Sequence, residues 1–342
     1  LSGFVTKAMI LTAAADGGGA IPNIGRLSIE NGLLTYRDGV SGEITKITLT
    51  AVEAEAKSTD DPLQLTVQAA FNDMAVKLNG SLGPLKNAIG GDQPVQIDLT
   101  AQGLGLTARI KGSAKATTGA LDARIDVSAA DLSGLRPLAG DAVPANVGLK
   151  FSAQAKAAGS KADLSDLSLV LGNSDLAGSF SVDTSGKLPM VTAALSGKRL
   201  DLVQLLPPVD KDGASKKPTG KKTSRPGKVF PNQRLPLGVL KALDANMKLS
   251  LAEVVAPDIS LRDVSVAASL KKGRLSLKPI SLTVAGSAVK LAASADAGRK
   301  VPAVVFEMAA SKLDLGRLLS EAKATDLLHG TGNLSVKLAG RG

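Results

Sequence analysis

The sequence of 342 residues contains no cysteine and no tryptophan, and it has one tyrosine and one histidine. The absence of cysteine excludes disulfide frameworks and cysteine nucleophiles, and a lone histidine cannot pair with a second one at a metal. A Ser-His-Asp triad would depend on His329 alone, which we expect at a helix end. We therefore expect a protein that is not an enzyme and that uses no metal or other cofactor.

Aromatic side chains are scarce, at 2% of the residues. A compact globule of this length normally uses aromatic bulk in its core. The apolar content here is leucine, valine, isoleucine and alanine, which favours a thin, repetitive architecture. Aromatic platforms that stack on single-stranded nucleic acid are also missing. Although the formal net charge is +10, we do not expect a nucleic-acid partner.

Half of the formal net charge, +5 of +10, lies in one Pro/Gly/Ser-rich stretch, residues 208–228. We interpret residues 208–233 as a basic loop or linker that separates an N-terminal repeated β region, 1–207, from a C-terminal β region, 234–342. Two interpretations of the basic residues stay open. They are either a solvated linker or a contact with anionic lipid headgroups. The lysines concerned are Lys216, Lys217, Lys221 and Lys222.

Apolar and polar residues alternate with a period of two through most of the chain, which is typical of strands with one dry face and one wet face. Turn signals such as Asn31-Gly32, Asn79-Gly80 and Lys272-Gly273 separate the segments. We predict a mainly β fold, an elongated and twisted antiparallel sheet or groove built from repeats. The clearest alternating segments are 63–71, 95–101, 104–110, 121–127 and 147–153, and short helices are expected at 132–139, 202–206 and 315–321, with weaker signals at 84–90 and 236–243.

An internal repeat places residues 188–206 on residues 301–319 at an offset of 113, and an offset of 70 adds a third copy. Each copy ends in an Asp-Leu-x-x-Leu step, at Asp131, Asp201 and Asp314. We predict that these aspartates are helix N-caps rather than functional acids.

Apolar positions that match across the repeats have two interpretations. They form either the core of a closed sandwich or an open groove that binds acyl chains, because a single long sheet must cover its apolar face with something. The sequence leaves both open. The groove candidates are Leu121, Ile125, Val191, Leu195, Val304, Phe306 and Met308.

Three stretches resemble the AsmA family. They are residues 28–39 (SIENGLLTYRDG), 261–285 (LRDVSVAASLKKGRLSLKPISLTVA) and 313–340 (LDLGRLLSEAKATDLLHGTGNLSVKLAG). Together with the repeated LDL-x-x-LL step they extend the resemblance over about 24–342, apart from the basic loop. Many members have Gly-Gly where this chain has Ala285-Gly286. The chain also stops short of the usual family end and lacks the N-terminal anchor, so we expect an internal fragment.

The resemblance implies a protein of the Gram-negative envelope, anchored in the inner membrane by an N-terminal helix and otherwise periplasmic. It implies a link to outer-membrane biogenesis and to phospholipid movement between the membranes along an apolar β-groove. The family supplies no catalytic residues. The alternative hypothesis is a structural scaffold with a closed β core that assists outer-membrane proteins through its sheet edges.

Overall fold

The structure is a computed structural model. It describes residues 9–14, 23–37, 44–71, 74–90, 93–115, 117–140, 143–144, 146–206, 240–257, 259–298, 303–321, 327 and 329–341. The chain divides into two compact units, Leu1–Ser185 (unit 1) and Gly186–Gly342 (unit 2). Each is described by itself.

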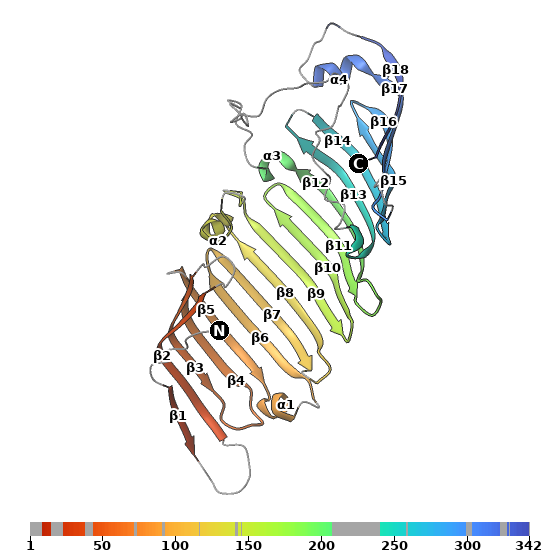
Figure 1. The fold of residues 1–342 in the computed structure, drawn as a ribbon. Coiled ribbons are helices and arrows are strands. Elements are labelled where there is room, and N and C mark those ends of the chain that lie inside the picture. The colour runs from red at the N-terminus through yellow and green to blue at the C-terminus, as the bar shows by residue number, and fades with distance from the viewer. Residues whose placement is uncertain are drawn as a thin grey trace, which may run out of the picture. The chain divides into compact units, whose positions relative to one another are not determined.

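Unit 1 is an antiparallel meander in which each strand pairs with the next along the chain (Figure 1). Its alternating segments form strands because one face of each becomes apolar and the other polar. The strands are β1 (Met9–Ala14), β2 (Asn23–Arg37), β3 (Ile44–Glu55), β4 (Leu63–Phe71), β5 (Met74–Gly83), β6 (Val95–Gly103), β7 (Leu106–Lys115), β8 (Ala120–Ala129), β9 (Leu149–Ala158), β10 (Lys161–Leu171) and β11 (Ser174–Asp183).

Unit 2 begins with a parallel pair and continues as an antiparallel meander. Strand β12 (Met190–Asp201) runs in the same direction as β13 (Asp244–Ala256). A parallel pair needs a long connection, and residues 202–243 supply it. The antiparallel strands that follow are β14 (Ile259–Lys271), β15 (Arg274–Val284), β16 (Ser287–Asp296), β17 (Ala303–Asp314) and β18 (Thr331–Arg341).

One of the three predicted Gly turns is confirmed. Lys272-Gly273 joins β14 to β15 with φ of 50° and 77°, as a two-residue hairpin turn requires. Ala285-Gly286 forms the same kind of turn between β15 and β16, with φ of 48° and 76°.

The turn predictions at Asn31-Gly32 and Asn79-Gly80 are wrong, because both pairs lie inside strands, β2 and β5. Asn31 has φ of 54°, which asparagine tolerates. A Cβ at Gly80 would lie 1.9 Å from the carbonyl oxygen of Asp98, so this glycine permits close approach of the neighbouring strand β6.

Short helices follow some of the strands, and the three aspartate caps are confirmed. The carboxylate oxygens of Asp131, Asp201 and Asp314 accept hydrogen bonds from the backbone N–H groups of Ser133 (2.9 Å), Gln204 (3.2 Å) and Arg317 (2.9 Å). The helices are α1 (Leu85–Gly90), the 3₁₀ helix η1 (Leu132–Leu135), α2 (Arg136–Ala139), α3 (Leu202–Leu205) and α4 (Leu315–Glu321).

The prediction of a mainly β, mostly antiparallel fold with a few short helices is confirmed. The parallel pair was not predicted. The units divide after Ser185, inside the predicted N-terminal region 1–207. The predicted linker, 208–233, lies outside the described residues, as does the first half of the weak helix signal at 236–243.

Candidate functional site

One face of unit 1 is apolar across its strands. Residues that pair directly in neighbouring antiparallel strands project from the same face of the sheet. The register therefore defines rows that cross the sheet at right angles to the strands. One row from β4 to β11 consists of Val67, Leu78, Ala101, Ala108, Val127, Phe151, Leu169 and Leu176.

The groove candidates Leu121 and Ile125 lie on this same face of unit 1. Leu121 belongs to a row with Val95 and Ala114. Ile125 belongs to the row of Leu99, Ile110 and Ala153.

The other five candidates share one face of unit 2. Leu195 and Met308 belong to one row, which starts on β12 and ends on β18. Val191 and Val304 belong to a second row and Phe306 to a third, beside them. The first row consists of Leu195, Leu249, Val266, Ile280, Leu291, Met308 and Val336.

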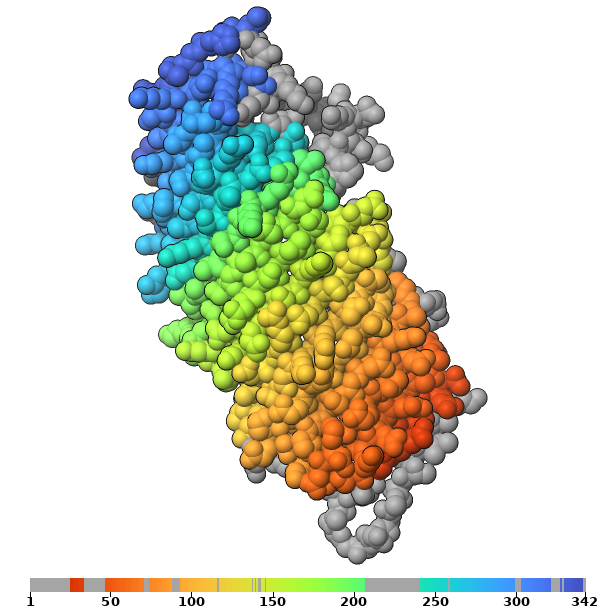
Figure 2. All heavy atoms as spheres, turned by 180° about the vertical axis from the view of Figure 1, so that it is seen from behind, coloured from red at the N-terminus to blue at the C-terminus, as the bar shows by residue number. Residues whose placement is uncertain are grey.

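No second layer covers the apolar face of unit 1 among the described residues. Its strands make extensive contacts with their neighbours in the sheet. Their other contacts of any extent are with the short helices. Most leucine, isoleucine and valine side chains of this face are half-buried. In Figure 2 the strands of unit 1 follow one another as bands from orange to yellow-green on the face in view. As far as its described residues go, unit 1 is a single sheet whose apolar side no other layer covers.

The opposite face of unit 1 is polar and contains ion pairs between neighbouring strands. The Arg109 guanidinium on β7 contacts both carboxylate oxygens of Asp98 on β6 at 2.9 Å, and Lys111 approaches the same carboxylate at 3.5 Å. The hydrogen bond from Arg109 holds the pKa of Asp98 below its usual range. Water therefore wets this face, and the sheet is amphipathic.

The apolar face of unit 1 has a hollow of about 270 Å³ at the strand ends next to α1. The groove candidate Leu121 is part of its wall. The lining residues are Leu82, Val95, Ile97, Ala114, Lys115, Gly119, Ala120 and Leu121. A second hollow, of about 320 Å³, lies over β16, β17 and β18 of unit 2 and includes Met308.

Unit 2 differs because part of its apolar face is buried. Val284, Val289, Ala310 and Leu313 form a buried cluster, here called the unit 2 cluster. Leu318 of α4 packs against it, as do the candidate Met308 and the side chains of Ile259, Leu261, Leu282 and Leu291. Met308 therefore packs against a buried core and does not lie only on an open face.

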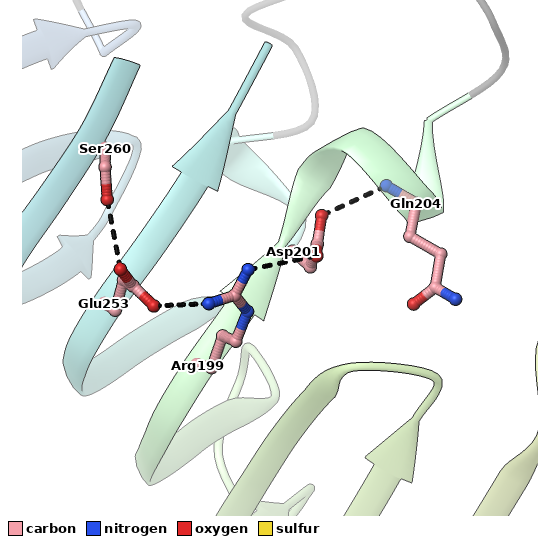
Figure 3. Close-up of polar contacts among 5 residues, drawn as sticks. All are labelled: Arg199, Asp201, Gln204, Glu253 and Ser260. Atoms are coloured by element: carbon pink, nitrogen blue, oxygen red, sulfur yellow. Dashed lines mark hydrogen bonds and ion pairs between the residues drawn. The ribbon is translucent and has the colours of Figure 1, made fainter. Parts of the chain in front are cut away.

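A polar cluster joins β12, β13, β14 and α3 (Figure 3). The Arg199 guanidinium contacts Glu253 at 2.7 Å and the N-cap Asp201 at 3.4 Å. The Ser260 hydroxyl donates to the other Glu253 oxygen at 3.2 Å. Together with Gln204, these residues are the Arg199 cluster. It connects the parallel strands to the helix cap, which is a structural role.

Sequence reasoning missed the Arg199 cluster. Arg199 and Asp201 stand two residues apart at the repeated Asp-Leu step, but their partner Glu253 lies 54 residues beyond Arg199. No local pattern indicates such a contact. The predicted headgroup contacts Lys216, Lys217, Lys221 and Lys222 lie outside the described residues, and His329 is exposed just before β18.

Among the described residues, no three metal-ligating side chains gather at one place, and none of the helices is long and apolar enough to cross a membrane. The model of the AsmA family matches residues 43–342. No curated protein and no solved structure matches the chain.

Proposed function

The chain belongs to the AsmA family, and from this premise we propose that it binds phospholipid acyl chains on its apolar sheet faces and passes them between the inner and outer membranes. We also propose that the protein lies in the cell envelope, with its described part in the periplasm and a tether to the inner membrane. It would act without catalysing a reaction. The family is associated with the bacterial envelope, which agrees with this location.

The uncovered apolar face of unit 1 is the observation that supports the proposal most strongly. Half-exposed leucine, isoleucine and valine side chains in water are unfavourable, and covering them gains about 25 cal/mol per Å². Acyl chains are long, apolar and flexible enough to lie along such a face. Their headgroups would stay in water at the strand ends. Movement would be passive and would follow a gradient of lipid.

The test is lipid analysis of the chain purified without detergent from a Gram-negative host. We expect about one or more phospholipids per chain by mass spectrometry of the extract. Ile125→Asp in unit 1 and Leu195→Asp in unit 2 place a charge on the proposed lipid-binding faces and should reduce the bound lipid strongly. Ser128→Asp is the matched control, because it adds the same charge to the polar face of β8.

Circular dichroism of each variant should stay that of a β protein. A folded Ile125→Asp variant with unchanged lipid content would contradict the assignment of this face. A stable wild-type chain without lipid would contradict the proposal as a whole.

The second candidate function is a scaffold for outer-membrane proteins with a closed β core. The unit 2 cluster favours it, since valines and leucines there are already covered by the chain itself. This candidate expects a lipid-free chain that cross-links to unfolded outer-membrane protein. The same lipid analysis therefore separates the two functions.

A further inference from the structure

The hollow of about 320 Å³ over β16, β17 and β18 lies on the polar face of unit 2. Three consecutive residues of each strand line it, and the middle residues are Leu291, Met308 and Val336, which pair across the strands. The side chains of Leu291 and Met308 pack against the unit 2 cluster on the opposite, apolar face. The middle row therefore contributes its backbone as the floor of the hollow, and the rows on either side of it supply the walls.

Two rows of polar-face residues form these walls. Neighbouring strands lie about 4.8 Å apart, so Lys290 on β16 and Ser335 on β18 stand about 10 Å apart at the backbone. Between them the wall has only the methyl group of Ala309, and all three residues are exposed. This arrangement leaves room above Ala309 for a small polar group. The first wall consists of Lys290, Ala309 and Ser335, and the second of Ala292, Glu307 and Lys337.

The hollow has more positive than negative charge. Lys337 pairs with Glu307 at 2.7 Å, and this hydrogen bond and charge hold the pKa of the Glu307 carboxyl below its usual range. The charge of Lys278 adds to the effect, so Lys278 also lies near the second wall. None of the ion pairs found among the described residues includes Lys290, and the residues opposite it in both neighbouring strands are uncharged. Lys290 therefore presents a positive charge that no acid in the hollow balances.

We propose that this hollow binds a phosphate group, which lies above Ala309 and accepts hydrogen bonds from the Lys290 ammonium and the Ser335 hydroxyl. The site goes beyond the function proposed above, because it lies on the sheet face opposite to the one that would bind acyl chains. A lipid headgroup and a soluble phosphate ester share this group. The hollow recognises what they have in common.

The chemistry of the walls favours phosphate over other ligands. A tetrahedral phosphate directs its oxygens to several sides and can meet donors from β16 and β18 at once, whereas a planar carboxylate has only two oxygens. Lysine ammonium groups bind phosphate as point charges, and serine hydroxyls donate to phosphate oxygens. Single-stranded nucleic acid, which also has phosphates, needs aromatic surfaces on which its bases stack, and the walls have none.

The experiment offers the purified chain the two sources of phosphate. Calorimetry follows binding of soluble glycerol 3-phosphate, and flotation follows binding to phosphatidylglycerol vesicles, with phosphatidylcholine vesicles as the net-neutral reference. Lys290→Gln removes the charge that faces the proposed phosphate and should weaken binding about fivefold. Lys248→Gln is the matched control, because Lys248 is exposed on the polar face of β13, outside the hollow. It should leave the affinity for glycerol 3-phosphate unchanged and should weaken vesicle binding less than Lys290→Gln does.

A second pair of variants tests the place above Ala309. Ala309→Glu puts a carboxylate directly opposite Lys290 in the neighbouring strand, where the two charges can pair. This variant should lose more affinity than Lys290→Gln, because it adds a negative charge where the phosphate would lie. Ala309→Gln has nearly the same size without the charge and should lose less. Circular dichroism checks that each variant keeps the β fold.

The outcomes separate the two sources and test the site itself. Lys290-dependent binding of glycerol 3-phosphate shows that a soluble ester suffices, and Lys290-dependent binding to vesicles alone assigns the site to a lipid headgroup. Either result supports the site. Absence of binding to both sources overturns it, as does an equal loss in Lys290→Gln and Lys248→Gln, which would mean that only diffuse charge acts. Displacement by acetate at the same concentration as glycerol 3-phosphate also overturns it. None of these results depends on lipid bound to the apolar faces.

Discussion

In unit 1 the buried apolar residues of the sheet strands are the alanines Ala54, Ala123, Ala153 and Ala155, whereas in unit 2 they include leucines and valines. Both units are built from strands with the same alternation. The buried strand positions of unit 1 therefore carry small side chains. The unit 2 cluster instead buries large side chains against one another and against α4.

Register shifts occur in both units. In unit 1 the pairings from β4 to β9 have none, but the β1–β2, β3–β4, β9–β10 and β10–β11 pairings each contain one. In unit 2 the β14–β15 pairing contains two, and the β15–β16 and β17–β18 pairings contain one each. Bulges bend a strand and increase its twist. Strands β13 and β14 are visibly curved in Figure 1. The comparison teaches that alternation decides which residues share a face, while an added element such as α4 decides whether part of that face is covered.

The largest expected effect on stability comes from a charge placed in the apolar face of each unit. Val284→Asp places an unpaired carboxylate in the unit 2 cluster and should cost more than about 4 kcal/mol of unfolding free energy. Ile125→Asp, on the open face, should cost only about 1–2 kcal/mol, because its side chain is half-exposed. Urea unfolding followed by circular dichroism measures both. Equal losses would mean that the face of unit 1 is also a closed core.

Truncation of a leucine sharpens the comparison at a smaller scale. Leu313→Ala leaves a cavity in the unit 2 cluster and should cost about 3 kcal/mol. Leu121→Ala removes a half-exposed side chain in unit 1 and should cost about 1 kcal/mol. The same urea experiment applies. A larger loss for Leu121→Ala than for Leu313→Ala would reverse the assignment of open and covered faces.

Loss of an ion pair should also destabilise unit 2 more than unit 1, but the difference should be smaller than for the apolar residues. Glu253→Gln weakens the Arg199 cluster, which is partly buried, and should cost about 1 kcal/mol. Lys156→Gln removes an exposed pair with Asp122 in unit 1 and should stay within about 0.5 kcal/mol of wild type. Thermal unfolding of both variants in low and high salt is the measurement, and only the Lys156→Gln effect should vanish in salt.

The smallest effect concerns the Asp131 cap of unit 1. Hydrogen bonds from the Ser133 hydroxyl and backbone N–H lower the pKa of the Asp131 carboxyl. A lowered folded-state pKa stabilises the fold above the unfolded pKa of aspartate, about 4, and this stabilisation disappears as the pH falls through the folded value. The advantage of wild type over Asp131→Asn should therefore shrink as the pH falls below about 4.

Thermal melts at a series of pH values follow this change. Ser133→Ala removes the donor and should reduce the same pH dependence. An advantage that grows on acidification would contradict the cap's role.

Much of the fold followed from the sequence because it depends on local pattern. The strands around Leu99 and Ile125 and the caps at Asp131, Asp201 and Asp314 are recognisable from a few neighbouring residues. Gly80 misled the prediction, since an Asn-Gly pair also occurs where two strands approach closely. Tertiary contact overrides turn propensity at such a position.

The rest depended on distant partners. The contact of Arg199 with Glu253 and the parallel pairing of β12 become visible only when the register is known. A sequence does not state which charges are balanced across strands.

The parallel pairing of β12 with β13 also sets an order for folding. Every antiparallel pair of unit 2 is closed by a connection much shorter than residues 202–243, so its chain-entropy cost is lower. Pairs of low sequence separation form faster than those of high separation. The β13–β18 meander should therefore assemble first and provide the template, and β12 should add to its edge last. The Arg199 cluster forms in that final step, so it stabilises the folded unit without accelerating its folding.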